Sequence, residues 1–167
     1  MNDIVIHCKY DELKNPKDLK DHPKNRNQHG SDQIERLAEL YKYHGIRHPI
    51  IVSKLSNCIV AGHGRKLAAI RAGIDKYPVV YQEFKSKESE YAFIQADNAI
   101  ALWAELDIES IKMDILELNK DFNLDLLGMK NFSLDIINFQ PGTIDDQGKL
   151  DEKKKIECPE CGYEFTP

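Results

Sequence analysis

The hydrophobic positions between residues 33 and 44 recur at the spacing of an amphipathic helix. They lie three or four positions apart, so that one face of a helix would be apolar. Asp32 and Glu35 are placed as a capping pair at its start, and Gly45 follows as a stop. The pattern therefore predicts a helix over Gln33–His44. Its apolar face consists of Ile34, Leu37, Ala38 and Tyr41.

Short apolar runs between polar turns predict β-strands on either side of further helices. Two of these runs, Pro49–Val52 and Cys58–Ala61, are separated by a polar turn with Ser56 and Asn57, and they predict a strand pair. Because strands and helices alternate, the sequence predicts an α/β (α+β) domain. The other predicted strands are Ile4–Cys8 and Tyr77–Tyr81, and the other predicted helices are Lys66–Ala72, closed by Gly73, and Lys87–Leu102, opened near Ser86.

The stretch Lys14–Gly30 is polar, rich in Asn, Lys and Pro, and has no apolar period. It predicts a loop of unusual length for a compact domain. Because long ordered loops are often functional, we expect this one to take part in binding.

The pattern changes after residue 104. Residues 105–137 hold eight Asp/Glu and three Lys/Arg, and helical spacing recurs over Asp107–Leu118 and Leu134–Phe139, around a break at Gly128. The next stretch is charged and lacks aromatic residues, so it cannot bury enough surface to order itself. The predicted organisation is a folded domain (1–104), an acidic helical annex (105–139), a flexible linker (140–156) and a CxxC tail (157–167).

Composition favours a cytoplasmic protein without a membrane partner. With 167 residues, 41% of them hydrophobic, the chain has room for one compact domain and a tail. It contains no run of about 18 apolar residues that could span a bilayer. Its start, Met1–Ile4, lacks the basic and then apolar pattern of an export signal.

Charge is segregated along the chain despite a net charge of only -5. Residues 14–71 hold twelve Lys/Arg against five Asp/Glu, whereas residues 72–167 hold ten against twenty. A basic N-terminal half fits an anionic ligand such as a phosphate or a nucleic acid. A solvated basic face is the alternative explanation.

The sequence Gly62-His63-Gly64-Arg65 lies between a predicted strand and a predicted helix. Glycines at such a turn let backbone N–H groups converge on an anion, and the helix adds its unpaired amides and the positive end of its dipole. Arg65 can offer a planar fork to phosphate oxygens, and Lys66 can add a point charge. A purely structural turn is the alternative.

Several motifs appear in a fixed order around this turn. Asn25 and His29 precede the first helix, a strand led by Pro49 follows it, and Asp97-Asn98 lies in a later helix. With the turn at 62–65, the stretch from Pro23 to Asp107 resembles the ParB/sulfiredoxin-like superfamily. It is most similar to the ParB-like domains of phages and mobile elements, including the type fused to DNA methyltransferases.

The resemblance implies a ParB/sulfiredoxin-like fold that binds CTP or ATP, with magnesium bridging the phosphates. It implies a nucleotide-dependent switch in phage or mobile-element DNA metabolism, modification or partition, with DNA or a DNA-modifying protein as partner. The residues assigned to the nucleotide are Pro49, Gly62, His63, Gly64, Arg65, Lys66, Asp97 and Asn98.

Two other functions stay open at this point. Partition proteins of the family have Glu where this chain has His63, which leaves hydrolysis in question. One alternative is a small NTPase, kinase or nuclease of the same fold, with His63 and His29 as proton-transfer groups. The other is a nucleotide-free adaptor that dimerises through zinc. The chain has no methyltransferase motif, so it does not methylate DNA by itself.

Cys158 and Cys161 form a C-x-x-C pair that resembles one knuckle of a zinc ribbon. Tetrahedral zinc needs four ligands, and the chain has no second C-x-x-C pair. A bound zinc ion would therefore require two copies of the chain, giving a homodimer, or distant residues such as Cys8 or His7. A metal-free tail is the alternative.

Overall fold

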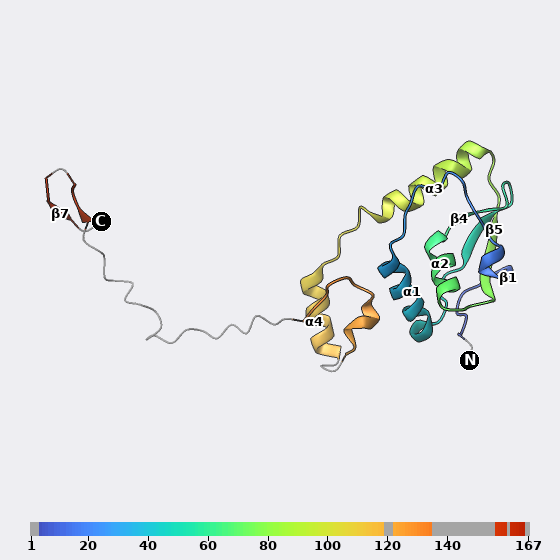
Figure 1. Cartoon of the computed structure of the whole chain (residues 1–167), viewed down its shortest axis with the longest axis horizontal. Helices are drawn as coiled ribbons and strands as arrows, with labels where there is room; N and C mark the ends of the chain where they lie inside the picture. Colours follow the sequence, from blue (N-terminus) through green and yellow to red (C-terminus); the bar gives the residue numbers. More distant parts are fainter. Residues whose placement is uncertain (1–3, 119–121, 135–155, 160, 166–167) are drawn as a thin grey trace. The chain divides into compact units, whose positions relative to one another are not determined.

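The structure is a computed structural model, and it describes residues 4–118, 122–134, 156–159 and 161–165. The chain divides into two compact units, Met1–Ser133 and Leu134–Pro167. The larger unit is a mixed α/β fold, which confirms the predicted fold class (Figure 1). Among the described helices, each is too short or too polar to cross a lipid bilayer.

A five-stranded mixed sheet forms the centre of the larger unit, with strand order β1-β5-β3-β4-β2. The predicted strand pair is confirmed, since β3 and β4 are antiparallel neighbours. β5 runs parallel to β3, β1 pairs antiparallel with β5, and β2 pairs parallel with β4. The strands are β1 (Glu12–Lys14), β2 (Lys20–Asp21), β3 (Ile50–Ser53), β4 (Cys58–Ala61) and β5 (Tyr77–Gln82).

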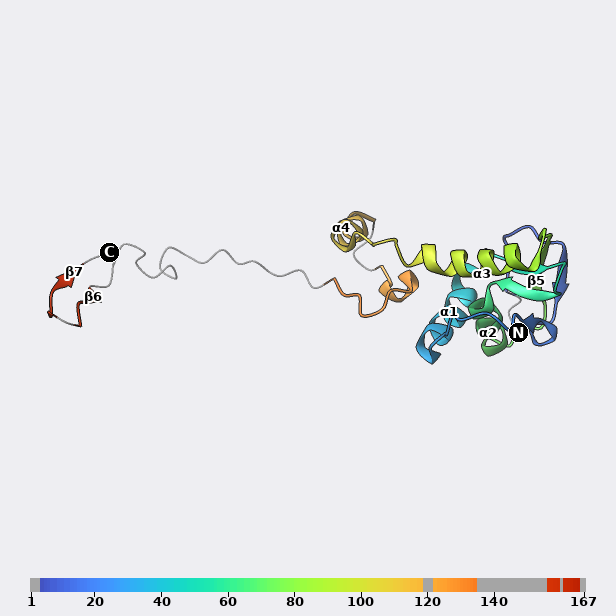
Figure 2. The ribbon, with the colours of Figure 1, turned by 90° about the horizontal axis from the view of Figure 1, so that it is seen from above.

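Helices cover both faces of this sheet. α1 (Ser31–His44) and α2 (His63–Arg71) pack against each other on one face, whereas α3 (Lys87–Ala101) lies across the other (Figures 1 and 2). Ser86 begins α3 as predicted, and its hydroxyl accepts a hydrogen bond from Ser89 N–H in a reciprocal capping box.

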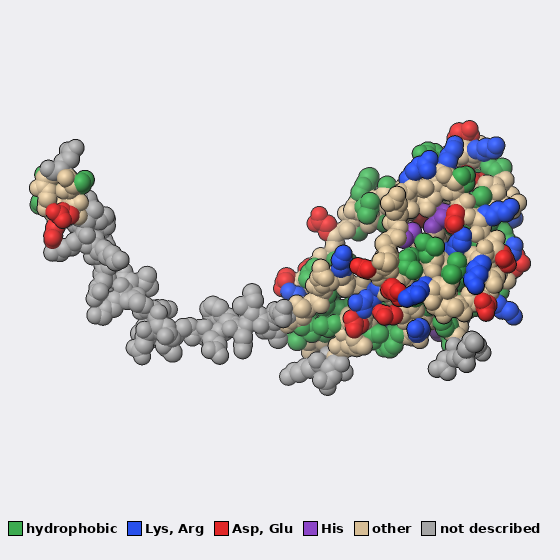
Figure 3. All heavy atoms as spheres, in the orientation of Figure 1, with side chains coloured by type: hydrophobic (Ala, Val, Ile, Leu, Met, Phe, Trp, Pro, Cys, Tyr) green, Lys and Arg blue, Asp and Glu red, His purple; other side chains and the backbone are tan. Residues whose placement is uncertain are grey.

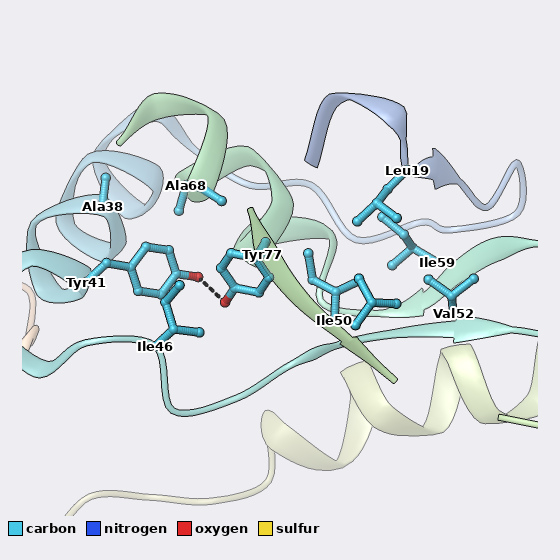
Figure 4. Close-up of a cluster of buried hydrophobic side chains, with 11 residues drawn as sticks. Leu19, Ala38, Tyr41, Ile46, Ile50, Val52, Ile59, Ala68 and Tyr77 are labelled. Atoms are coloured by element: carbon cyan, nitrogen blue, oxygen red, sulfur yellow. Dashed lines mark hydrogen bonds between the residues drawn. The ribbon is translucent and has the colours of Figure 1, made fainter. Parts of the chain in front are cut away.

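The main hydrophobic core lies between the sheet and the α1–α2 layer (Figure 4). Ile50, Ile59 and Val79 from three neighbouring strands are fully buried there, together with Ala68 of α2. At one end of the core, the hydroxyl of Tyr77 donates a hydrogen bond of 2.9 Å to that of Tyr41. Burial therefore fixes α1 and α2 on the sheet and positions the strand-to-helix turn between β4 and α2.

Two predicted helix starts differ from the observed ones. α1 begins at Ser31 after Gly30, which provides no side-chain cap, so the predicted capping pair is wrong. Glu35 instead forms an ion pair with Arg71. The second helix begins at His63 rather than Lys66. The sequence predicted a glycine loop there, whereas the structure has only Gly62 outside the helix.

The N-terminal segment also differs from the prediction. The predicted strand Ile4–Cys8 is wrong, because only an isolated bridge between Ile6 and Ile46 forms there. Conversely, the predicted loop Lys14–Gly30 contains the 3-10 helix η1 (Pro16–Asp18) and β2. Its two-residue strand forms by pairing with β4, a long-range contact that local sequence does not reveal.

The annex after α3 contains α4 (Ile108–Leu118), close to the predicted bounds, and the 3-10 helix η2 (Leu124–Leu127). η2 lies against α1, where Arg36 Nη1 is 2.9 Å from Asp125 Oδ1 and His44 Nε2 is 3.1 Å from the carbonyl oxygen of Leu126. The helix predicted over Leu134–Phe139 and the predicted linker fall almost entirely outside the described residues.

The smaller unit contains a β-hairpin of β6 (Ile156–Glu157) and β7 (Glu164–Phe165), paired antiparallel. Its turn carries both Cys158 and Cys161. Two backbone hydrogen bonds close the turn, from Cys158 N–H to the carbonyl of Tyr163 and from Gly162 N–H to the carbonyl of Cys158. The predicted CxxC tail is therefore a hairpin in its described part.

Candidate functional site

The first turn of α2 has the backbone features of an anion site. Gly62 is left-handed (φ 103°, ψ 27°) and turns the chain sharply from β4 into the helix. The N–H of Lys66 bonds to the carbonyl of Gly62 at 3.0 Å. The N–H groups of His63, Gly64 and Arg65 precede it, and no acceptor for them occurs among the described residues. Three unpaired amides thus meet at the positive end of the helix dipole.

Arg65 is held against the strand that the sequence analysis assigned to the same site. Its Nη1 donates a hydrogen bond to the carbonyl oxygen of Pro49, and it would lie 3.2 Å from a Cβ added to Gly62. The half-buried guanidinium carries five N–H donors, so this bond leaves others for a ligand. The structure therefore brings Pro49, Gly62 and Arg65 together.

Lys66 is buried and paired. Its Nζ is 2.7 Å from Oδ2 of Asp21 in β2, and the lysine residue is only 8% exposed. Sequence analysis had assigned this ammonium group to a phosphate. In the structure it joins α2 to the edge strand of the sheet, and a phosphate would have to share it with Asp21.

Residues 22–30, which we call the strap, run across the N-terminal turn of α2. The ring of His29 lies against Gly64, where an added Cβ would be only 2.9 Å from the ring Cε1 and 3.0 Å from Nδ1. The other contact of the ring is with α1, since Nδ1 is 3.0 Å from Gln33 Oε1. The absence of a side chain at Gly64 therefore allows the His29 ring of the strap to lie against the first turn of α2.

The strap also contacts the second half of α3. Asn27 Nδ2 donates a hydrogen bond of 3.0 Å to Asn98 Oδ1, and Gln95 Nε2 donates one of 3.2 Å to the carbonyl of Lys24. Asn98 Nδ2 bonds to the carbonyl of Ile94, which fixes the orientation of its amide. Asp97 is exposed on the same turn. The strap thus links two regions that the sequence analysis assigned to one ligand.

His63 is buried at the point where the strap begins. Its Nε2 accepts a hydrogen bond of 3.3 Å from the N–H of His22, so the neutral ring carries its proton on Nδ1. Burial lowers the pKa of His63, and the neighbouring His29, His22 and Lys66 act in the same direction, whereas Asp21 opposes them. At neutral pH this histidine is therefore an uncharged acceptor that anchors the strap.

Sequence analysis did not identify the buried polar network beneath the strap. His22 Nδ1 accepts from Lys24 N–H, and its Nε2 lies 3.1 Å from Oε1 of Glu90. The other carboxylate oxygen of Glu90 accepts a 2.6 Å hydrogen bond from the hydroxyl of Ser53. One signal was present in the sequence, because Glu90 lies four residues before Ile94 and hence on the buried face of α3.

The same network fixes the charge of Glu90. Burial alone would raise the pKa of this carboxyl group, but hydrogen bonds from Ser53 and Ser56 and the proximity of His22 outweigh it and lower the pKa. Glu90 is 2% exposed and carries its charge inside the protein. A cleft of about 300 Å³ adjoins it, lined by the start of the strap, the β3–β4 turn and Lys87 and Tyr91 of α3.

Basic and histidine side chains surround this region of the larger unit. Figure 3 shows histidines (purple) on the face that it presents, with both Lys and Arg side chains (blue) and acidic side chains (red) around them. Lys24 adds to them from the strap, where its Nζ lies 5.6 Å from the centre of the Tyr91 ring. These cations are available to an anionic ligand, although Asp21 already pairs with Lys66.

The cysteines are the remaining predicted site residues. The structure places Cys158 and Cys161 in one hairpin turn, and neither forms a disulfide. Within the described residues, no group of three or more His, Cys, Asp or Glu side chains is arranged to hold a metal ion. The described part of the hairpin thus supplies two thiols.

Comparisons with known proteins agree on one family. A family model described as the ParB N-terminal domain matches residues 9–98, more than half of the chain. The ParB-like nuclease domain-containing protein YnaK of Escherichia coli (strain K12) is 32% identical over 63 residues, which cover 38% of this chain and 71% of YnaK.

Two solved structures resemble the fold. One is C-terminally truncated chromosome-partitioning protein ParB from Caulobacter crescentus complexed with CTP-gamma-S, with a TM-score of 0.56, 21% identity and coverage of 71% of each chain. The other is the C2221 form of a Pnob8-like ParB-N domain, with a TM-score of 0.43, 16% identity and coverage of 68% of this chain and 48% of that one. At these identities the likeness to the Caulobacter protein concerns the fold.

Proposed function

The chain belongs to the ParB N-terminal domain family, and from this premise we propose that it binds a nucleoside triphosphate at the first turn of α2. The observation that carries the proposal is the set of unpaired amides of His63, Gly64 and Arg65 at a helix N-terminus. The Caulobacter relative of the same fold was solved with CTP-gamma-S, which supports CTP or ATP as the class of ligand.

Backbone amides and cations of α2, together with a side-chain amide of α3, would hold the phosphates. Arg65 supplies guanidinium donors beyond the one bonded to Pro49, and Lys66 supplies a partly neutralised ammonium group. Asn98 faces the strap from α3. A magnesium ion bound with the nucleotide would offset the phosphate charge, and the exposed carboxylate of Asp97 is the candidate protein ligand for it.

We propose that binding acts as a switch through the strap. His29 now covers Gly64, so phosphates that reach the amides must displace or rearrange this ring. The same movement would change the bond between Asn27 and Asn98 on α3. Binding energy would thereby be coupled to the position of the strap. This switch would act in the DNA metabolism, modification or partition of a phage or mobile element.

Contact with DNA, if it is direct, would use the basic segment 14–71. The annex is an unsuitable surface, because its acidic side chains repel phosphate backbones. A DNA-modifying protein is the other partner that we consider, and it would be selected by the position of the strap. In either case the N-terminal unit provides the nucleotide-dependent step.

We do not assign nucleotide hydrolysis to His63. Its ring is buried, its Nε2 already accepts from His22 N–H, and burial lowers its pKa. His29 is more accessible and remains the candidate for a proton-transfer group if the nucleotide is hydrolysed. Phosphate release that is lost in His29→Ala and retained in His63→Ala would support an enzyme; equal background release in both would support binding alone.

Thermal unfolding with a panel of nucleotides tests the proposal. We expect CTP or ATP with magnesium to raise the Tm of the wild-type chain by several degrees, since ligand at 100 times Kd adds about 2.7 kcal/mol. Arg65→Ala should lose most of this shift. Arg71→Ala is the matched control, because Arg71 lies in the last turn of the same helix and pairs with Glu35.

Two results would contradict the proposal. One is a wild-type Tm that no nucleotide changes. The other is a ligand-induced shift that Arg65→Ala retains in full. Comparing the shift, rather than the Tm itself, separates binding from the structural bond between Arg65 and Pro49.

A further inference from the structure

The C-terminal hairpin places two cysteines in one tight turn. Cys158 follows β6 directly, and Cys161 lies three residues on, before Gly162. Cys158 N–H bonds to the carbonyl of Tyr163 at 3.0 Å, and Gly162 N–H bonds to the carbonyl of Cys158 at 2.9 Å. Gly162 has φ 69°, a left-handed conformation that closes the turn. The backbone is therefore arranged so that both thiols leave the same short turn.

These two thiols differ in setting from the other two cysteines. Cys161 is exposed and Cys158 half-buried in the hairpin. Cys8 packs against the hydrophobic core, and burial raises the pKa of its thiol, which disfavours the thiolate that a metal requires. The Cys58 thiol donates to the carbonyl of Ser56 at 3.5 Å in the β3–β4 turn.

We propose that Cys158 and Cys161 form one half of a zinc site, and that the same two cysteines of a second copy of this chain complete it. Zinc in structural sites takes four ligands in a tetrahedron, usually cysteine and histidine. The hairpin supplies two, and no described residue extends the pair to a group of three. The sequence contains no other C-x-x-C pair.

Two copies related by a twofold axis would provide a four-thiolate site. Each turn contributes the same pair of ligands, as a closed symmetric dimer requires. Zinc displaces the proton of each thiol to solvent when the thiolate binds, and no oxidation or reduction takes place. The ion would therefore hold two chains together at their C-terminal hairpins, independently of any nucleotide at α2.

Metal content and molecular mass of the full-length chain test this inference, measured without nucleotide. We expect one zinc ion per two chains, in a dimer that a chelator converts to monomer and added zinc restores. Cobalt in place of zinc should give an intense thiolate-to-metal charge-transfer absorption. Cys158→Ser and Cys161→Ser should each lose the metal, the absorption and the dimer.

Cys58→Ser is the matched control and should keep the metal, the absorption and the dimer. One zinc ion per monomeric chain would overturn completion by a second copy, because the remaining ligands would then come from the same chain. A chain that takes up no zinc would overturn the site itself. Neither result bears on nucleotide binding by α2, which the thermal-shift panel measures separately.

Discussion

Among single residues, Gly64 is the one whose size the site restricts most clearly. A Cβ there would lie 2.9 to 3.2 Å from three atoms of the His29 ring. Gly64→Ala should therefore displace the strap. We expect overpacking to cost about 1–3 kcal/mol of unfolding free energy, offset by about 1 kcal/mol from the better helix propensity of alanine. Urea unfolding measures the net effect.

A probe of the contact between His29 and residue 64 distinguishes displacement of the strap from a general loss of stability. In Gly64→Ala, the amide and ring signals of His29 should shift in NMR spectra. Leu67→Ala is the control in the same helix, since Leu67 is exposed. Unchanged His29 signals in Gly64→Ala would show that the ring does not lie on this glycine.

The buried ring of His63 makes stability depend on pH in a defined direction. Its pKa is lowered in the folded protein relative to the usual value near 6.5. The unfolded chain therefore binds more protons as pH falls below about 6.5, and stability decreases there. The stability contributed by the uncharged His63 ring is fully present above that pH. The free energy of unfolding should therefore fall when the pH is lowered from about 7.5 to about 5, a range that includes the usual histidine pKa.

His63→Gln should flatten this dependence, because an amide can accept from His22 N–H without titrating. A slope that is the same in wild type and His63→Gln would assign the pH dependence to other groups.

The residue types of the site could be predicted from sequence, but their pairings could not. The glycine pattern indicated a turn between a strand and a helix, which the structure has at Gly62, whereas His63 and Gly64 already belong to α2. The partners of the cations depend on long-range folding: Arg65 bonds to Pro49, and Lys66 to Asp21, 45 residues away in sequence. Residue spacing in the sequence does not predict such contacts, because they depend on how the intervening chain folds.

At the scale of elements, the network around Glu90 connects α3, β3 and the strap. Glu90→Ala would leave the His22 ring and the Ser53 hydroxyl without their buried partner. Leaving a buried hydrogen-bonding group without its partner costs about 1–3 kcal/mol, and more where the lost partner is charged. Glu90→Gln keeps the shape and should cost about 1–3 kcal/mol. Denaturant unfolding of both variants provides the measurement.

Glu88→Gln is the matched control in the same helix. Glu88 lies in the first turn of α3 and is exposed, so its substitution should change stability much less than Glu90→Ala does. Equal effects of Glu88→Gln and Glu90→Ala would mean that the buried network contributes nothing specific to the fold.

Elements with a strong hydrophobic period were predictable, and elements formed by long-range pairing were not. α1, α3, α4 and the pair β3–β4 follow from their apolar spacing. β1 has three residues and β2 has two, too few to show alternation, and both depend on partners far along the chain. The apolar run Ile4–Cys8 looked like a strand, but it packs only Ile4, Ile6 and Cys8 on the core and forms no ladder.

At the scale of the whole molecule, the two compact units are proposed to have separate roles. The larger unit, Met1–Ser133, contains the α2 turn, the strap and α3, whereas the smaller unit contains the cysteine hairpin. A chain ending at Ser133 should therefore keep the nucleotide-induced rise in Tm and lose zinc binding. Loss of the nucleotide response in this shortened chain would show that the larger unit is not sufficient.

The central claim is that phosphates bind to the amides at the start of α2, and an NMR titration tests it most directly. At 19.2 kDa, the chain is small enough for assigned amide spectra. CTP or ATP with magnesium should cause the largest amide shifts at His63, Gly64 and Arg65, together with the strap residues Asn27 and His29. Saturating shifts confined to other parts of the chain, or no shifts at all, would contradict the account.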